Sequence, residues 1–155
     1  MKERFETFTV LINRISRNIK KIKNQAMSNY NLRSTHVSCL YYLYTSNGLT
    51  ATELCERCEE DKATISRALN HLEKNGYLSY KITGSRRYKS PLVLTDVGRK
   101  VGGEIADQIT AVLETISVDL ADRDRTVLYR SLDVISKALD TIASHPKAQK
   151  NGTNA

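Results

Sequence analysis

The chain has 155 residues, enough for one compact unit with a hydrophobic core. Hydrophobic residues make up 40% of it, and no apolar run approaches the ~20 residues that span a bilayer. The segment MKERFETFTV also lacks the apolar core of a signal peptide, so we expect a cytoplasmic protein. The net charge of +7 and the pI near 9.4 favour a polyanionic partner.

An amphipathic pattern predicts a long helix over residues 3–28. Apolar residues recur there at alternating spacings of three and four, as in a heptad repeat. They are Phe5, Phe8, Ile12, Ile15, Ile19 and Ile22. A helix of about 24 residues is ~36 Å long, more than a small domain needs to cover its own core. We therefore expect a homodimer with Phe5, Phe8, Ile12 and Ile15 at its interface.

Two short helices are expected next. Ser34 or Thr35 can cap the first, and Asn47-Gly48 ends it. The second begins at Thr50, and Glu53 follows three residues later, which is the pattern of a capping box.

A fourth helix is predicted over residues 61–75, with Asp61 as its cap and Asn75-Gly76 as its end. Its apolar stripe consists of Ile65, Ala68, Leu69 and Leu72. The opposite face carries Ala63, Arg67, Asn70 and Lys74, with Thr64 and His71 beside them. This face either keeps the helix soluble or binds a partner.

The periodicity then changes to that of a β-hairpin. Residues 77–82 and 90–95 have strand composition, and the segment TGSRRYK between them resembles a turn. Between Glu73 and Asp96 there is no carboxylate. The cations of this interval are Lys74, Lys81, Arg86, Arg87 and Lys89.

Helical periodicity resumes at Asp96, and a last helix is expected from a cap at Asp122. Gly102-Gly103 indicates a bend or close packing. The last helix supplies Ile135, Leu139 and Ile142 to the expected dimer interface. The expected organisation is an N-terminal dimerisation helix (1–30), a winged helix-turn-helix domain (31–95), C-terminal helices that complete the dimer interface (96–145) and a disordered tail (146–155).

This order of elements is mainly α with a small β-hairpin wing, the order of a winged helix-turn-helix domain flanked by long dimerisation helices. A helix fits the ~12 Å major groove of DNA when its outer face carries donors and few carboxylates. Arginine can bond guanine in a bidentate manner and asparagine can pair with adenine. We therefore expect helix 61–75 in the major groove, and the wing 82–90 on the backbone or in the minor groove.

The segment LTATELCERCEEDKATISRALNHLEKNGYL, followed by GSRRYKSPLVLTDVGRK, resembles the MarR family of bacterial transcriptional regulators. The resemblance covers nearly the whole chain and includes the motifs L-x-x-x-G-Y-L and L-T-x-x-G. It implies a homodimer that binds a pseudo-palindromic operator, usually as a repressor released by a small ligand or by oxidation. It places Thr64, Ser66 and Arg67 on the recognition helix, and Arg86 and Arg87 in the wing.

The expected DNA-binding residues come from three places, the start of the second helix, the recognition helix and the wing. They are Ser34, Thr35, Lys62, Ala63, Thr64, Ser66, Arg67, Asn70, His71, Lys74, Arg86, Arg87 and Lys89. One departure from the family concerns the wing. Many members carry an Asp-x-Arg pair that braces it, and the corresponding positions here hold Arg86 and Tyr88.

Three cysteines do not make a disulfide scaffold. Cys55 and Cys58 form a C-x-x-C pair, which we interpret as structural thiols, since no further ligands stand at zinc-finger spacing. The alternative is a thiol redox protein that uses this pair, although the βαβ context of such a motif is missing. Cys39 lies near the place where the family has its effector pocket, so a sensing thiol there is a second hypothesis.

Tyrosines cluster around the second helix. Tyr30, Tyr41, Tyr42 and Tyr44 are either alternating core and surface residues or, with Cys39, the wall of a pocket for an aromatic or apolar effector. No phosphate-binding glycine loop, zinc signature or nucleophile–base pair is present, so we expect no enzyme, metal or cofactor. A winged helix used only for protein or RNA contacts remains an alternative.

Overall fold

The computed structural model describes residues 2–46, 48–80, 90–117 and 120–145. The chain divides into two compact units, Met1–Thr110 and Ala111–Ala155. The elements are α1 (Lys2–Ala26), the 3-10 helix η1 (Ser28–Tyr30), α2 (Ser34–Thr45), α3 (Ala51–Cys58), α4 (Lys62–Lys74), β1 (Leu78–Tyr80), β2 (Leu92–Leu94), α5 (Asp96–Ser117) and α6 (Asp122–Ser144). The mainly helical fold with a small hairpin is confirmed, and β2 is shorter than the predicted strand over 90–95.

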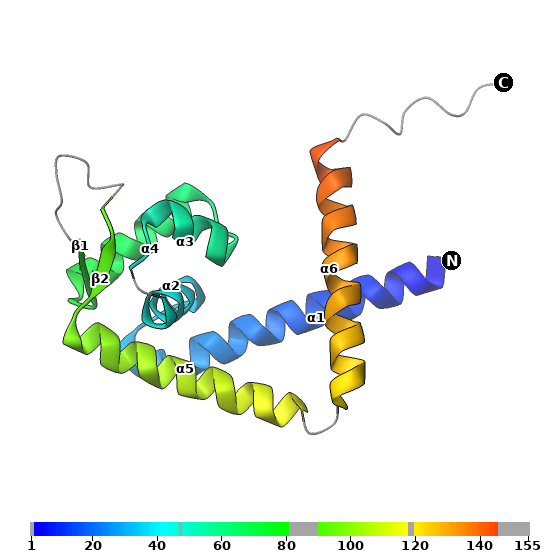
Figure 1. Cartoon of the computed structure of the whole chain (residues 1–155), viewed down its shortest axis with the longest axis horizontal. Helices are drawn as coiled ribbons and strands as arrows, with labels where there is room; N and C mark the ends of the chain where they lie inside the picture. The colour runs from blue at the N-terminus through cyan, green and yellow to red at the C-terminus, as the bar shows by residue number, and fades with distance from the viewer. Residues whose placement is uncertain (1, 47, 81–89, 118–119, 146–155) are drawn as a thin grey trace. The chain divides into compact units, whose positions relative to one another are not determined.

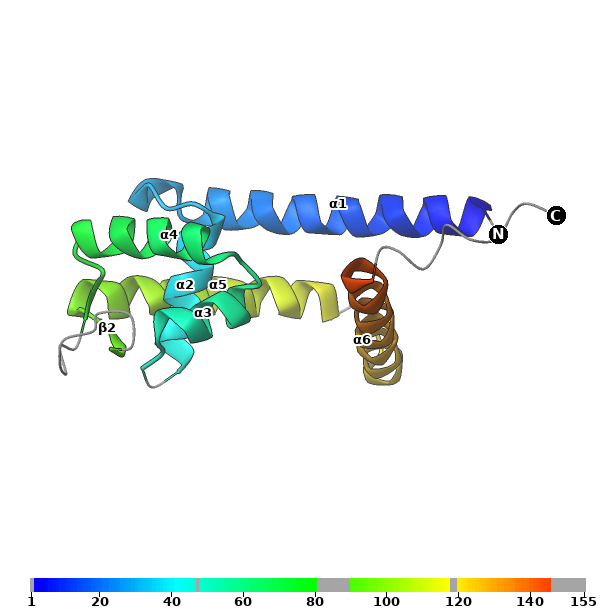
Figure 2. The ribbon, with the colours of Figure 1, turned by 90° about the horizontal axis from the view of Figure 1, so that it is seen from above.

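The core of the first unit surrounds α2, which packs against both α3 and α4 (Figure 1 and Figure 2). Its buried residues come from every element between α2 and α5. They include Val37, Cys39, Leu40, Leu43, Leu54, Ile65, Ala68, Leu69, Leu72, Leu78, Leu92, Leu94, Val101 and Ile105. The apolar stripe predicted for α4 is therefore buried, and the helix turns its opposite face outward.

Two of the four predicted helix caps are present. The Thr50 hydroxyl accepts the Glu53 N–H at 3.3 Å, and a Glu53 carboxylate oxygen accepts the Thr50 N–H at 2.7 Å, which completes the capping box of α3. Asp61 caps α4. The cap predicted at Asp122 is wrong, because the N-cap position of α6 is Ala121.

The cap predicted at Ser34 or Thr35 is also wrong, because Arg33 occupies the N-cap position of α2. Side chains from other positions satisfy the free N–H groups there. Asn24 Oδ1 accepts the Ser34 N–H at 2.7 Å, and His36 Nδ1 accepts the Arg33 N–H at 3.1 Å.

The strands β1 and β2 pair antiparallel, with Leu78 opposite Leu94 and Tyr80 opposite Leu92. The Leu92 N–H also donates to the Leu49 carbonyl at 2.9 Å, so the segment before α3 lies along the outer edge of β2. The base of the wing is thereby fixed to the helix-turn-helix.

A junction of hydrogen bonds holds the end of α4 against the start of α5. The Thr95 hydroxyl donates to the Gly76 carbonyl at 2.6 Å and accepts the Gly98 N–H at 3.0 Å, and the Thr95 N–H donates to the Tyr77 carbonyl at 3.1 Å. Gly76 has φ +74, a left-handed conformation that suits glycine. The motifs L-x-x-x-G-Y-L and L-T-x-x-G thus meet in space.

Gly102 and Gly103 allow close packing and leave α5 helical throughout. A Cβ atom on Gly102 would lie 2.8 Å from the Tyr44 Cβ, so the α2 and α5 backbones approach at this point. The sequence allowed either a bend or close packing at this point, and the structure has close packing. The described helices include none long and apolar enough to cross a membrane.

Candidate nucleic-acid interface

The outward face of α4 is polar and well supplied with donors. Ala63, Arg67, Asn70 and Lys74 are exposed, while Thr64, Ser66 and His71 are partly buried at its margins. The buried stripe on the other side fixes this orientation, because turning α4 about its axis would expose four core residues. The helix therefore offers an arginine, an asparagine and a lysine in one row.

A chain of side-chain hydrogen bonds orients Arg67. The Arg67 Nη2 donates to the Thr64 hydroxyl oxygen at 3.0 Å, and that hydroxyl donates to Asp61 Oδ2 at 2.7 Å. Asp61 Oδ1 also accepts the Thr64 N–H at 2.8 Å. These two bonds from Thr64, first the N–H and then the hydroxyl, lower the pKa of Asp61 and keep it ionised. The capping carboxylate thus also aligns the guanidinium.

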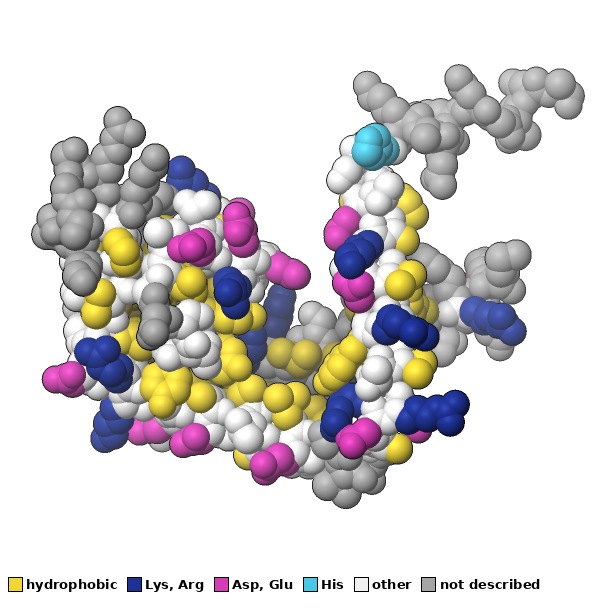
Figure 3. Space-filling model, in the orientation of Figure 1, with side chains coloured by type: hydrophobic (Ala, Val, Ile, Leu, Met, Phe, Trp, Pro, Cys, Tyr) yellow, Lys and Arg dark blue, Asp and Glu magenta, His cyan; other side chains and the backbone are white. Residues whose placement is uncertain are grey.

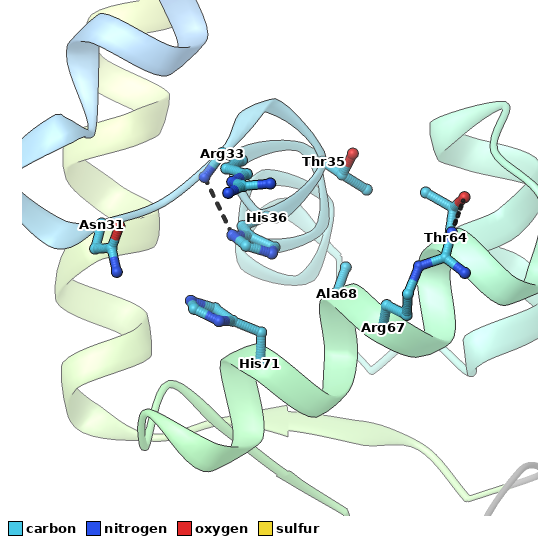
Figure 4. Close-up of a pocket in the computed structure, with 8 residues that line it drawn as sticks. All are labelled: Asn31, Arg33, Thr35, His36, Thr64, Arg67, Ala68 and His71. Carbon is cyan, nitrogen blue, oxygen red and sulfur yellow. Dashed lines mark hydrogen bonds between the residues drawn. The ribbon is translucent and has the colours of Figure 1, made fainter.

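A hollow of about 380 Å³ lies between the start of α2 and the outer side of α4 (Figure 4). Its lining residues are Asn31, Arg33, Thr35, His36, Thr64, Arg67, Ala68 and His71. Two arginines at its margin make it suited to an anion. Neither Asn31 nor Arg33 was predicted from the sequence, although a cation directly before a helix start is a signal that could have indicated Arg33.

His36 and His71 stack inside this hollow. Their ring centroids are 4.2 Å apart and their planes differ by 4°. Burial first, and the neighbouring charge of His71 second, lower the pKa of His36 to about 4, so its ring is neutral at pH 7. Its Nδ1 can therefore accept the Arg33 N–H. The stack links the recognition helix to the start of α2, and His71 is part of this packing as well as of the polar face.

The remaining predicted DNA-binding residues lie at three places. Ser34 and Thr35 are partly buried in the first turn of α2, and Lys62 is exposed in the first turn of α4. Arg86, Arg87 and Lys89 lie outside the described residues, as does most of the predicted wing 82–90.

Comparison with known proteins identifies the family of this arrangement. The model of the MarR family matches residues 30–87, from η1 through the helix-turn-helix into the wing. Over this segment the chain is similar to the MarR family of regulators. Among curated proteins, the chain is similar to YwoH, an uncharacterized HTH-type transcriptional regulator of Bacillus subtilis (strain 168). The two sequences are 29% identical over 114 residues, and this aligned stretch is 74% of this chain and 82% of YwoH.

Solved structures of this family share the fold over most of its length. NMB1585, a MarR family regulator from Neisseria meningitidis, is 20% identical, with a TM-score of 0.81 over 93% of this chain and 99% of that one. The MepR–DNA complex from S. aureus is 19% identical, with a TM-score of 0.76 over 85% of this chain and 97% of that one. The chain thus has the winged helix-turn-helix fold of the MarR family regulators to which it is similar.

Outside the winged domain, exposed apolar residues lie on α1, α5 and α6. On α1, Ile15 is 54% exposed, and Ile12, Ile19 and Ile22 share its face. Phe8 is partly buried, and the side chain of Phe5 lies outside the described part. Within the second unit, α6 exposes Leu139 and Ile142, whereas Ile135 is partly buried. Hydrophobic side chains along this helix are visible in yellow in Figure 3.

The residues predicted to line an effector pocket lie on η1 and α2. The Tyr30 hydroxyl donates to Glu104 Oε2 at 2.7 Å, Tyr41 and Tyr42 stack edge to face, and Cys39 is fully buried. Tyr44 lines a groove of about 550 Å³ with residues of β2 and α5, and the other four are not among the residues that line it.

The three cysteines are free thiols on α2 and α3. Cys58 and Cys39 of α2, 19 positions apart in the sequence, affect each other's pKa, which is lowered for Cys58 and raised for Cys39. Cys55 and Cys58 are partly buried at the margin of the core. No local spacing connects Cys39 with Cys58, so this pair could not be predicted from the sequence.

Proposed function

We propose that the protein is a sequence-specific DNA-binding regulator that acts as a homodimer. Helix α4 enters the major groove, and the segment 82–90 contacts the backbone or the minor groove. The observation that carries this proposal is the outward face of α4, on which Thr64 and Asp61 orient Arg67. S. aureus MepR, whose fold is similar, was solved in complex with DNA.

The chemistry of α4 suits base recognition. A bidentate arginine–guanine pair needs a guanidinium whose plane is set in advance, and the bond to Thr64 does this. Asn70 lies about one turn further along the same face, where an amide can pair with adenine. The exposed methyl of Ala63 lets the start of the helix approach the bases.

Phosphate contacts supply the remaining affinity. We expect Arg33 and the first turn of α2, which lie beside the hollow next to α4, to bind a backbone phosphate of the same half-site. Ser34, Thr35 and Lys62 border this region, and the wing cations Arg86, Arg87 and Lys89 add charge. Such contacts set the register of the protein on DNA and make binding dependent on salt.

The exposed apolar faces of α1 and α6 support the homodimer. Heptad spacing on α1 allows a second copy to cover Ile12 and Ile15, and Leu139 and Ile142 on α6 add to the same interface. A two-fold dimer presents two copies of α4 to a pseudo-palindromic site with half-sites one helical turn, about 34 Å, apart.

We further propose that the protein acts as a repressor in the cytoplasm. A small apolar or aromatic ligand releases it from DNA by binding in the region of Tyr30, Cys39, Tyr41, Tyr42 and Tyr44.

Binding to double-stranded DNA is expected to weaken steeply with salt. The logarithm of the association constant should fall linearly with the logarithm of salt concentration, with a slope of about −0.9 for each neutralised phosphate. Fluorescence anisotropy with duplexes from the DNA upstream of the coding sequence measures this slope. Double-stranded RNA of the same sequence is the control, because its deep, narrow major groove excludes a helix. Equal affinity for both duplexes, or none for DNA, would refute the proposal and favour RNA or protein contacts.

Ile15→Glu is expected to dissociate the dimer, because it places a charge in an apolar interface on both copies. Sedimentation should give the mass of two chains for the wild type and of one chain for the variant. The matched control Asn13→Glu introduces the same charge on the far side of α1 and should stay dimeric. A monomeric wild type, or a dimeric Ile15→Glu variant, would rule out this interface.

A further inference from the structure

The outer side of α1 carries a set of cations that the winged domain does not use. Between Glu6 and Glu53 the sequence contains no carboxylate, although six lysines and arginines lie in this interval. Within the described part of the chain, the four of them that are exposed on α1 form no ion pair. These four residues, which we call the basic face of α1, are Arg14, Arg17, Lys20 and Lys21.

The basic face lies on the side of α1 opposite its apolar stripe. At about 100° per residue, Arg17 points away from the centre of the isoleucine stripe Ile12–Ile22. Arg14, Lys20 and Lys21 lie within about 60° of Arg17 around the helix axis. A second copy of the chain that covers the stripe therefore leaves the basic face exposed.

The stability of the helix does not explain these cations. Arg14 and Arg17 are three residues apart, where like charges repel each other and destabilise a helix. The helix dipole favours cations in the last turn, and Lys23 is the cation of α1 that lies there. On α6, by contrast, Lys137 pairs with Asp133 at 2.7 Å. The basic face thus lacks a partner of opposite charge within the described part of the chain.

One end of the basic face meets the proposed phosphate site. Asn24 follows Lys20 and Lys21 by about one turn on the same side of α1, and its Oδ1 accepts the Ser34 N–H at 2.7 Å. This bond places that side of α1 beside the first turn of α2, next to Arg33, which lines the hollow at α4. From there α1 runs away from α2 and α4 (Figure 2), so its cations extend the positive charge of the hollow in that direction.

We propose that the basic face of α1 binds the sugar–phosphate backbone of the DNA segment between the two half-sites. The proposal rests on the proposed function and adds a second contact to that of α4. Since α1 leads from the start of α2 to the proposed dimer interface at Ile12 and Ile15, its cations lie between the half-site and the two-fold axis. The helix rises ~15 Å from Asn24 to Arg14, and a half-site centre lies ~17 Å from the axis.

The spacing of the cations also suits a DNA strand. Residues 14–21 cover ~11 Å of helix, and one strand of DNA carries a phosphate about every 3.4 Å along its axis, which gives about three charges over the same length. Contacts to phosphates carry no direct sequence information. The basic face should therefore raise the affinity and the salt dependence of binding and leave the preferred bases unchanged.

The test compares the full-length α1 variant Arg14→Gln/Arg17→Gln with the matched control Arg123→Gln/Arg130→Gln, which removes the same two charges from exposed positions of α6. One duplex carries the site obtained by selection from random-sequence DNA. The second has the same sequence with neutral methylphosphonates in place of the phosphates between the half-sites. Fluorescence anisotropy over a range of salt concentrations measures binding, and sedimentation confirms that each variant is a dimer.

On the unmodified duplex, the slope of log affinity against log salt should be less steep for the α1 variant by about 3.6, which is 0.9 for each of four arginines in the dimer. The control should match the wild type. On the methylphosphonate duplex the wild type and the α1 variant should have equal slopes, because the phosphates that Arg14 and Arg17 contact are neutral there. Arg14→Lys/Arg17→Lys should keep the wild-type slope on both duplexes, since it keeps the charge.

The outcomes separate this contact from DNA binding by α4. If the wild type binds the unmodified duplex but the α1 variant has the same slope, the contact is refuted and the proposed function stands. A change of slope that persists on the methylphosphonate duplex, or that the lysine variant shares, would also overturn it. Unchanged DNA binding with loss of adsorption to phosphatidylserine vesicles would assign the basic face to an anionic membrane instead. If the wild type binds no DNA, the proposed function and this contact both fail.

Discussion

Gly98→Ala is expected to lower the free energy of unfolding by about 3 kcal/mol, the upper end of the usual cost of overpacking. A Cβ atom at this position would overlap with the Tyr77 carbonyl oxygen and lie 3.2 Å from a Leu94 methyl. The clash with a backbone atom cannot be relieved by a side-chain rotation, so the start of α5 must move away from the end of α4. This movement would also strain the bonds that Thr95 makes to Gly76 and Tyr77.

Gly103→Ala is the matched control for this stability change. It introduces the same methyl group into the same helix, where the nearest atom is the Tyr44 hydroxyl oxygen at 3.4 Å. Since alanine favours a helix over glycine by roughly 0.5–1 kcal/mol, the control should be neutral or slightly more stable. Urea unfolding followed by circular dichroism measures both variants. Equal midpoints would contradict the close approach at Gly98.

Arg67→Ala is expected to reduce affinity for the specific site by at least about 30-fold and to leave affinity for unrelated DNA much less affected. A bidentate arginine–guanine pair contributes about 1–3 kcal/mol of discrimination, and a dimer loses two such pairs. The folded structure should tolerate the change, because the Arg67 side chain is exposed. Its one hydrogen bond within the described part of the chain is the bond to Thr64.

Arg123→Ala provides the matched control, since it removes the same charge from an exposed position on α6. Its specific affinity should remain within about twofold of the wild type, because a charge that does not contact DNA is largely screened beyond about 10 Å at 0.1 M salt. Anisotropy titrations with specific and unrelated duplexes compare the two variants, and sedimentation confirms that both remain dimers. If both variants lose specific affinity equally, general charge determines binding and α4 has no special role.

Local patterns in the sequence predicted most of the helices, because they depend on residues close together in the chain. The stripe Ile65, Ala68, Leu69 and Leu72 lies in the core as its spacing required, and Asp61 caps the helix it precedes. The α2 cap was missed because one of its two side-chain hydrogen bonds comes from Asn24, a residue of another helix. Local patterns cannot indicate such a partner.

The candidate site also has one part that local sequence patterns predict and another part that they cannot predict. The polar face of α4 follows from helical periodicity, and its key member Arg67 was identified on that basis. The His36–His71 stack and the effect of Cys39 and Cys58 on each other's pKa join residues of different helices, whose distances depend on how those helices pack. The C-x-x-C spacing directed attention to a neighbour in the sequence instead of the neighbour in space.

The structure gives a physical reason for the residues of the motif L-T-x-x-G. Leu94, Thr95 and Gly98 belong to L-T-x-x-G, a motif that the sequence indicated only through its resemblance to the family. Thr95 bonds the end of α4, and Gly98 leaves room for the Tyr77 carbonyl. The spacing of three residues between Thr95 and Gly98 is that of a helix cap and the N–H it binds.

Selection from a pool of random-sequence duplex DNA tests the central claim, that α4 reads bases, most directly. The selection works without a known operator and can be run in parallel on the wild type and Arg67→Ala. The wild type is expected to enrich an inverted repeat with half-site centres about 10 base pairs apart, and Arg67→Ala should lose the preference at one position of each half-site. An unchanged pool after selection by the wild type, or the same enriched sequence from both proteins, would contradict the account.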